Sequence, residues 1–136
     1  MSTQESAIVA TVTTETELFE LRTSAHDLRV LILEMAAGKG EGYVAQGLGM
    51  ADCLAALYFA EMKYDPSNPS WPERDRFLTS TGHYSIAMYA VLAHAGFFDP
   101  GELPTYGLNG SRLPMSTFDD LPGIEIVGGS LGQGLG

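Results

Sequence analysis

The chain has 136 residues, of which 45% are apolar and 18% charged, and its 17 acidic and 7 basic side chains give a formal net charge of -10. This length and composition predict one globular domain with a buried core and argue against a disordered chain. The basic residues are scattered between Arg22 and Arg112, which argues against a nucleic-acid surface or a polybasic membrane contact. No segment has the roughly 18 apolar residues of a membrane span, and the N-terminus lacks the pattern of a secretory signal. We therefore expect a cytoplasmic protein.

Residues 1–13 are expected to be a flexible leader, and a helix is predicted to follow. Thr14-Glu-Thr-Glu17 matches a capping box, which satisfies the first free amides of a helix. Glycine commonly ends helices, so we expect Gly38 and Gly40 to end this one. His26 falls on its polar face and is expected to be solvated. Apolar residues recur every three or four positions and predict one buried stripe: Leu18, Leu21, Ala25, Leu28, Leu31 and Met35.

A loop with alternating glycines, residues 38–42, leads through Tyr43 into a second predicted helix. Cys53 is the only cysteine of the chain, so no internal disulfide is possible. Its position on an apolar face predicts a buried, inert thiol. The residues that share this face are Met50, Cys53, Leu54, Leu57 and Tyr58.

Three prolines in residues 64–73 predict an irregular surface loop. Residues 74–80 are short and end apolar, which favours a single buried strand, and a turn over residues 81–83 follows. Residues 84–95 are apolar almost all round and predict a buried helix. His94 lies in this apolar run and is expected in the core or in an interface.

The last part of the chain is rich in glycine. Residues 96–101 are expected to stop the helix, residues 102–106 to add a helical turn, and residues 107–122 to form a long loop. Residues 124–127 predict a short strand before the glycine-rich stretch 128–136. This strand–turn–helix order predicts an α/β fold of which much of the parallel sheet is missing. We therefore expect the chain to be part of a larger domain.

The segment Gly128-Gly-Ser130-Leu-Gly132 has two chemical interpretations. It matches the nucleophile-elbow pattern of serine hydrolases, but an elbow serine is followed by its histidine, whereas the three histidines here precede it. Alternatively, small residues let the backbone approach an anionic group, which the start of a helix attracts. Residues 81–84 offer a second such place, with His83 at the start of a helix. The residues alone therefore favour a diphosphate site over a hydrolase, and ordinary glycine-rich turns remain the alternative to both.

Several blocks of the chain, between about Leu18 and Gly136, resemble blocks of the transketolases in the same order. The blocks are Gly49-Met-Ala-Asp52, Asp75-Arg-Phe-Leu-Thr-Ser-Thr-Gly-His83, Met88-Tyr-Ala-Val-Leu-Ala93 with Gly96, and Pro122-Gly-Ile-Glu125 followed by Gly129-Ser-Leu-Gly-Gln-Gly134. The resemblance implies an enzyme that uses thiamine diphosphate and Mg²⁺ to move a two-carbon ketol unit between sugar phosphates or related sugars. Residues 14–136 would form the N-terminal part of its diphosphate-binding domain, a parallel sheet flanked by helices.

The resemblance also implies roles for individual residues. His83 matches a histidine beside the cofactor diphosphate and the reacting carbon, and Gly129, Ser130 and Leu131 match the loop that lines the cofactor. Tyr43 and Met115 stand where the family often has histidines that contact the sugar, which makes both candidates for an altered substrate pocket. No metal ligand is expected within the chain, because the family's Mg²⁺ ligands would lie beyond Gly136. We therefore expect these 136 residues to be inactive on their own.

The resemblance further implies an active site shared between subunits, either in a homodimer or with a separate C-terminal subunit. In an isolated piece, the apolar helix faces around Leu54, Leu57, Val91 and Leu92 are expected to be exposed. Two alternatives remain open: a non-catalytic protein that keeps the fold, and another thiamine-diphosphate enzyme such as an oxo-acid dehydrogenase subunit.

Overall fold

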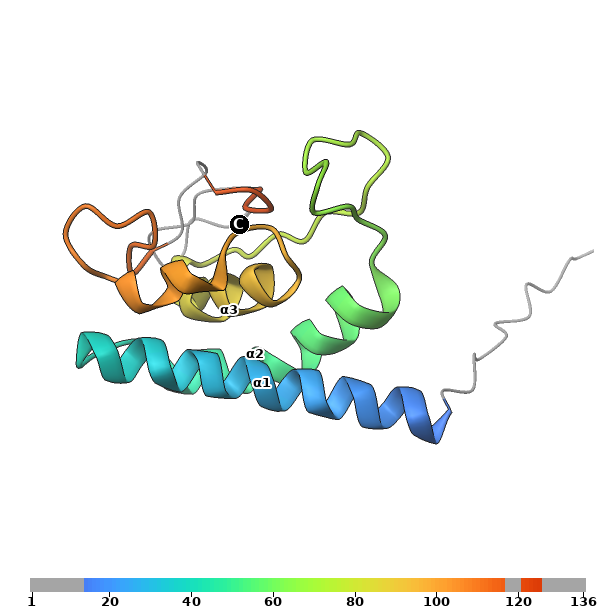
Figure 1. The fold of residues 1–136 in the computed structure, drawn as a ribbon, viewed down its shortest axis with the longest axis horizontal. Helices are drawn as coiled ribbons and strands as arrows, with labels where there is room; N and C mark the ends of the chain where they lie inside the picture. Colours follow the sequence, from blue (N-terminus) through green and yellow to red (C-terminus); the bar gives the residue numbers. More distant parts are fainter. Residues whose placement is uncertain (1–13, 117–120, 126–136) are drawn as a thin grey trace, which may run out of the picture.

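A computed structural model describes residues 14–116 and 121–125, and the regular structure it assigns to them is helical. In Figure 1, α1 runs along one side of the molecule, and the two shorter α-helices lie beside it. The elements in chain order are α1 (Glu15–Lys39), α2 (Val44–Ala56), the π-helical turn η1 (Leu57–Glu61), the 3-10 turn η2 (Gly82–Tyr84), α3 (Ser85–His94) and the 3-10 segment η3 (Pro100–Thr105).

Both predicted ends of α1 are confirmed. The amide of Glu17 donates to the Thr14 hydroxyl over 3.2 Å, and the Glu17 carboxylate accepts from the Thr14 amide over 2.7 Å, which completes the capping box. At the other end Gly40 adopts a left-handed conformation with φ of 81°. The predicted apolar stripe is buried only from Ala25 onward. Residues 14–20, which include Leu18 of the stripe, are all exposed. The buried residues of α1 are Ala25, Leu28, Ile32, Met35 and Ala36.

The buried face of α2 differs from the predicted one. It consists of Gly47, Ala51, Leu54 and Ala55, which recur at helical spacing. Cys53 is exposed, so the prediction of a buried thiol is wrong. The reason is rotational: Cys53 lies outside the face of α2 that packs against the other helices.

The predicted buried helix α3 is confirmed, since residues 85–93 are all buried. His94 is exposed and meets the ring of Phe59 edge-on, with 5.2 Å between centroids. The prediction that His94 lies in the core is therefore wrong. His94 is the last residue of α3, where the segments that bury the helix no longer cover it. Leu54, Val91 and Leu92 are at most 1% exposed. They form the core instead of the expected open apolar faces, and Leu57 packs partly buried against it.

The predicted strand at residues 74–80 is not found. These residues run without regular structure, and Leu78 is 55% exposed. A strand needs a neighbour to complete its hydrogen bonds, and no strand is assigned within residues 14–116 or 121–125. Part of the second predicted strand, residues 126–127, and the predicted leader, residues 1–13, lie outside the described residues. The parallel sheet is thus not confirmed, whereas the irregular loop at residues 64–73 is. In the described part of the chain, no helix combines the length and the apolar character needed to cross a membrane.

Two glycines of α2 provide a matched test of this packing. A Cβ atom at Gly47 would lie 3.0 Å from the Cγ2 atoms of both Ile32 and Ile86, whereas one at Gly49 would have no atom within 4 Å. We expect Gly49→Ala to raise the free energy of unfolding by about 0.5–1 kcal/mol, because alanine favours a helix over glycine. Gly47→Ala should lower it by about 1–2 kcal/mol, because overpacking outweighs the same gain. Urea denaturation measures both, and equal shifts would contradict the packing at Gly47.

Candidate functional site

Unpartnered polar atoms gather at the N-terminal end of α3. Among the described residues, three buried side-chain polar atoms have no hydrogen-bond partner: Thr81 Oγ1, His83 Nδ1 and the Tyr106 hydroxyl. Thr81 and His83 lie on either side of Gly82, in the turn that leads into α3. Ser85 lies beside the Tyr106 phenol, but its hydroxyl donates to the Met115 carbonyl. Because buried polar groups are usually paired, a polar group bound at this cluster would supply the hydrogen bonds that these atoms lack.

Tyr43 and His83 are in direct contact, although 39 residues of chain separate them. Their rings meet edge-on, with 4.6 Å between centroids and 70° between planes. Gly42 allows this approach, because a Cβ atom there would lie 3.3 Å from Ile86 Cδ1 and 3.5 Å from a ring carbon of Tyr106. The glycine loop therefore packs closely on the first turn of α3 and brings Tyr43 to the histidine.

The starts of α2 and α3 share an electrostatic feature. Tyr43 and Tyr84 occupy their N-cap positions, and neither makes a capping hydrogen bond through its side chain, in contrast to Thr14 at the start of α1. The first amides of a helix carry a partial positive charge. Burial raises the pKa of the Tyr106 phenol, so this group stays neutral and adds no negative charge. The cluster is thus suited to an anionic or strongly polar group.

Met115 reaches the cluster through its backbone. Its carbonyl accepts from Ser85, two residues after His83, and the Pro114 carbonyl accepts from the Tyr89 hydroxyl over 2.9 Å. The Met115 side chain lies by the position of Gly107, where a Cβ atom would be 3.2 Å from Met115 Cγ. The structure therefore brings Tyr43 and His83 together and fastens the Met115 loop to the same helix end.

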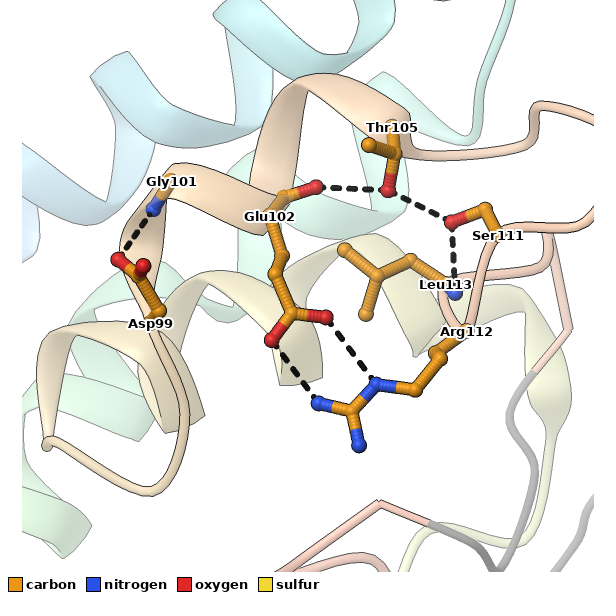
Figure 2. A network of polar contacts seen from close by, with 7 residues as sticks. All are labelled: Asp99, Gly101, Glu102, Thr105, Ser111, Arg112 and Leu113. Carbon is orange, nitrogen blue, oxygen red and sulfur yellow. Dashed lines mark hydrogen bonds and ion pairs between the residues drawn. The ribbon is translucent and has the colours of Figure 1, made fainter.

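A polar network ties the other side of this loop to η3 (Figure 2). The hydroxyls of Thr105 and Ser111 are 2.7 Å apart, and Ser111 also accepts from the Leu113 amide over 2.9 Å. Arg112 binds both carboxylate oxygens of Glu102, over 2.9 and 3.1 Å. Residues 105–113 are thus held in one arrangement, and the loop approaches α3 from a fixed side.

Sequence reasoning found only part of this cluster. Thr81 lies within the block that carries the family resemblance but was not singled out. No sequence pattern marks Tyr106, which the chain that follows α3 brings to the site. Gly129, Ser130 and Leu131, the predicted cofactor loop, lie outside the described residues. Their proposed role, and the expected Mg²⁺ ligands, stay predictions.

The Ser85 hydrogen bond should be measurable in stability. Ser85 is fully buried, so Ser85→Ala leaves the Met115 carbonyl without its donor. We expect a loss of about 1–3 kcal/mol in the free energy of unfolding, the usual effect of leaving a buried acceptor unpaired. The control Ser70→Ala removes an exposed hydroxyl and should change stability by less than about 0.5 kcal/mol. Denaturant titration of both variants tests the contact, and an unchanged Ser85→Ala would contradict it.

Comparison with known proteins gives one family. Residues 21–136 match the family described as transketolase, thiamine diphosphate binding domain. The chain is 52% identical over 113 residues to the transketolase family protein y4mO of Sinorhizobium fredii, covering 82% of this chain and 40% of that protein. It is 44% identical over 116 residues to the 6-deoxy-6-sulfo-D-fructose transketolase subunit SqwG of a Clostridium species, covering 85% of this chain and 42% of that protein.

Solved structures agree with this family. Transketolase from Leishmania mexicana superposes with a TM-score of 0.78 at 34% identity, covering 84% of this chain and 17% of that enzyme. The chain thus spans about two fifths of the two relatives above and a smaller part of the transketolase of known structure. The match covers the turn with His83, the Tyr43 loop and the glycine-rich stretch alike. The chain therefore belongs to the transketolase family, within its thiamine diphosphate binding domain.

Proposed function

We propose that this chain provides the diphosphate-binding part of a thiamine-diphosphate-dependent transferase, which moves a two-carbon ketol unit between sugar phosphates or related sugars. The observation that carries the proposal is the cluster at the start of α3. There the imidazole nitrogen of His83 and the hydroxyl of Thr81 are buried and unpartnered, within a chain of the transketolase family. Both atoms suit a hydrogen bond to a polar, negatively charged cofactor.

In this proposal the residues of the chain bind and orient the cofactor, which, when bound, would supply the carbanion stabilisation that carbon–carbon bond transfer requires. His83 and Thr81 hydrogen-bond to the bound group, and the helix starts at Tyr43 and Tyr84 favour its negative charge. Gly129, Ser130 and Leu131 line the cofactor, on the family resemblance. Oxygen ligands from residues outside this set would hold a Mg²⁺ ion that offsets the negative charge of the diphosphate.

Tyr43 and Met115 are proposed to shape the sugar pocket. A phenol offers a hydroxyl and a thioether only a weak acceptor, where an imidazole offers two ring nitrogens. An enzyme with these two groups in place of imidazoles is expected to prefer other sugars than an ordinary transketolase does. The match to a protein named for a sulfonated sugar, 6-deoxy-6-sulfo-D-fructose, makes sulfonated analogues a necessary part of any substrate panel.

The working unit is proposed to contain more than this one chain. Two relatives are matched over about two fifths of their length, and one of them is named a subunit. A homodimer, or a pairing with a chain that carries the C-terminal part, would complete an active site shared between subunits. We place the assembled enzyme in the cytoplasm.

His83 is the first residue to test, in the assembled native protein. We expect His83→Ala to weaken thiamine diphosphate binding about 10- to 100-fold, because one charge-assisted hydrogen bond contributes about 1.5–3 kcal/mol. Calorimetric titration with the cofactor and Mg²⁺ measures this affinity. The matched control is His94→Ala, since His94 is exposed at the other end of the same helix. This control should leave cofactor affinity unchanged.

If His83→Ala and His94→Ala bind the cofactor equally well, the assignment of the diphosphate site fails. If the wild-type assembly itself binds no thiamine diphosphate, the protein is a non-catalytic member of the family.

Tyr43→His tests the substrate pocket. Because Tyr43 contacts His83 edge-on, an imidazole at this position reaches the same neighbourhood and restores a group that exchanges protons near neutral pH. We expect the variant to shift the ratio of kcat/KM toward ordinary ketose phosphates by about tenfold, which corresponds to about 1.4 kcal/mol. Turnover of sugar phosphates and sulfonated analogues by wild type and variant measures the shift. An unchanged ratio would remove Tyr43 from the pocket.

A further inference from the structure

Two blocks that lie far apart in the sequence are joined by an ion-pair network. Arg74 NH1 is 2.5 Å from one carboxylate oxygen of Glu125, and Arg76 Nε is 3.6 Å from the other. The side chains of Arg74 and Glu125 are only 9% and 12% exposed, whereas that of Arg76 is 42% exposed. Among the described residues, Glu125 therefore pairs with one buried and one largely solvated cation, both from this loop.

The loop presents Arg74 in a prepared position. At the base of the loop the backbones of Lys63 and Asp75 pair, with the Asp75 amide donating to the Lys63 carbonyl over 2.8 Å. The Asp75 carboxylate accepts from the Lys63 amide, also over 2.8 Å, so it is directed to the loop base. Arg74 Nε donates to the Pro69 carbonyl across the loop. The Arg74 guanidinium is thus held by a hydrogen bond within its own loop as well as by its ion pair with Glu125.

The Tyr58 phenol lies close enough to Glu125 to feel its charge. Burial, and next the negative charge of Glu125, raise the pKa of the Tyr58 phenol far above its ordinary value, so Tyr58 is neutral at physiological pH. Tyr58 also packs edge-on against Phe77, with 6.2 Å between ring centroids. An apolar, weakly solvated environment of this kind strengthens an ion pair and makes an unpaired charge unfavourable.

The segment that carries Glu125 has a second anchor. Gly123 has φ of 87°, and a Cβ atom there would lie only 2.5 Å from Leu92 Cδ2 and 3.1 Å from a ring carbon of Phe97. Leu121 is 2% exposed, and the Ile124 amide donates to its carbonyl over 3.1 Å to close the turn. Residues 121–125 are therefore held at one end against the C-terminal end of α3 and at the other by the two arginines.

We propose that Arg74 and Arg76, acting through Glu125, are positioning residues for the glycine-rich stretch that begins at Gly128. This inference rests on the proposed function, because that stretch includes Gly129, Ser130 and Leu131, to which we assign cofactor contacts. Glycine has no side chain that could pack and select one backbone conformation. Glu125 precedes Gly128 by three residues, so an anchor at Glu125 limits where the stretch can begin.

A positioning role makes a specific kinetic prediction. If the network only selects the binding-competent conformation, its loss reduces the fraction of molecules in that conformation, and the apparent Kd for the cofactor rises by the inverse of this fraction. Once the cofactor is saturating, the same conformation is fully populated. The kcat at saturating cofactor should then be unchanged, which distinguishes positioning from contact with the reacting atoms.

The experiment compares three variants in the native assembled protein. Glu125→Gln keeps the shape of the side chain and removes its charge, and Arg76→Gln removes only the solvated cation. The control Asp52→Asn breaks a partly exposed ion pair, that of Asp52 with Arg29. We expect the apparent Kd for thiamine diphosphate with Mg²⁺ to rise about tenfold in Glu125→Gln, about two- to fivefold in Arg76→Gln, and less than about twofold in the control. The kcat at saturating cofactor should stay within about twofold throughout.

A second readout needs no cofactor. Amide hydrogen exchange of peptides covering residues 121–136 should be faster in Glu125→Gln than in wild type or Asp52→Asn, since local opening becomes easier when an anchor is lost. Unchanged Kd and exchange in Glu125→Gln, even with a lower Tm, would overturn the proposal and leave a purely structural ion pair. A fall in kcat at saturation would also overturn it, because Glu125 would then act on the reaction itself.

The failure of the proposed function has a different signature. Wild-type protein that binds no thiamine diphosphate contradicts the cofactor assignment, and the exchange data alone then decide whether the arginines position residues 121–136. If Glu125→Gln does not fold, Arg76→Gln carries the test, because its side chain is half in solvent and its loss leaves the Arg74 pair in place. No change in either readout for a folded Arg76→Gln would then count against the proposal.

Discussion

The complete burial of α3 determines the arrangement of the rest of the described structure. A ten-residue helix whose side chains from Ser85 to Ala93 are all buried must be covered on every side. α1 and α2 supply part of this cover, and the segments that follow α3 in the chain supply much of the remainder. Only the two ends of α3 are left for polar groups. His94 lies at one end in solvent, and the turn with Thr81 and His83 lies at the other, where burial and unmet hydrogen bonds coincide.

Local signals in the sequence predicted the helices well, because the responsible interactions span three or four residues. The capping box at Thr14 and the glycine stop at Gly40 work within one turn, and the all-apolar character of α3 is readable without knowing its neighbours. Errors arose where the outcome depends on neighbours. Cys53 and Leu54 are adjacent in the sequence, yet only the second faces the other helices. The predicted strand at residues 74–80 depends on a pairing partner that no local pattern supplies.

The candidate site shows the same division. The motif with His83 and the glycine loop with Tyr43 were visible as separate patterns, and the resemblance to transketolases joined them. Their edge-on contact, and the unpaired state of Thr81 and Tyr106, are properties of the packing and have no sequence signal of their own. The pairing of Arg74 with Glu125 belongs to the same class. Each residue lies in or beside a block that resembles the transketolases, but the sequence does not indicate which opposite charges form ion pairs.

The way the Met115 loop is attached to α3 has a consequence for how this pocket diversifies. The hydrogen bonds between α3 and the loop use main-chain carbonyls as acceptors: those of Pro114 and Ser116 accept from Tyr89, and that of Met115 accepts from Ser85. Every residue type at position 115 offers the same carbonyl. The side chain there can therefore be exchanged without loosening the loop from its helix. A fold with this form of attachment separates the geometry of the loop from the chemistry of its side chains, so that position 115 of the proposed sugar pocket can change while the helix beneath stays unchanged.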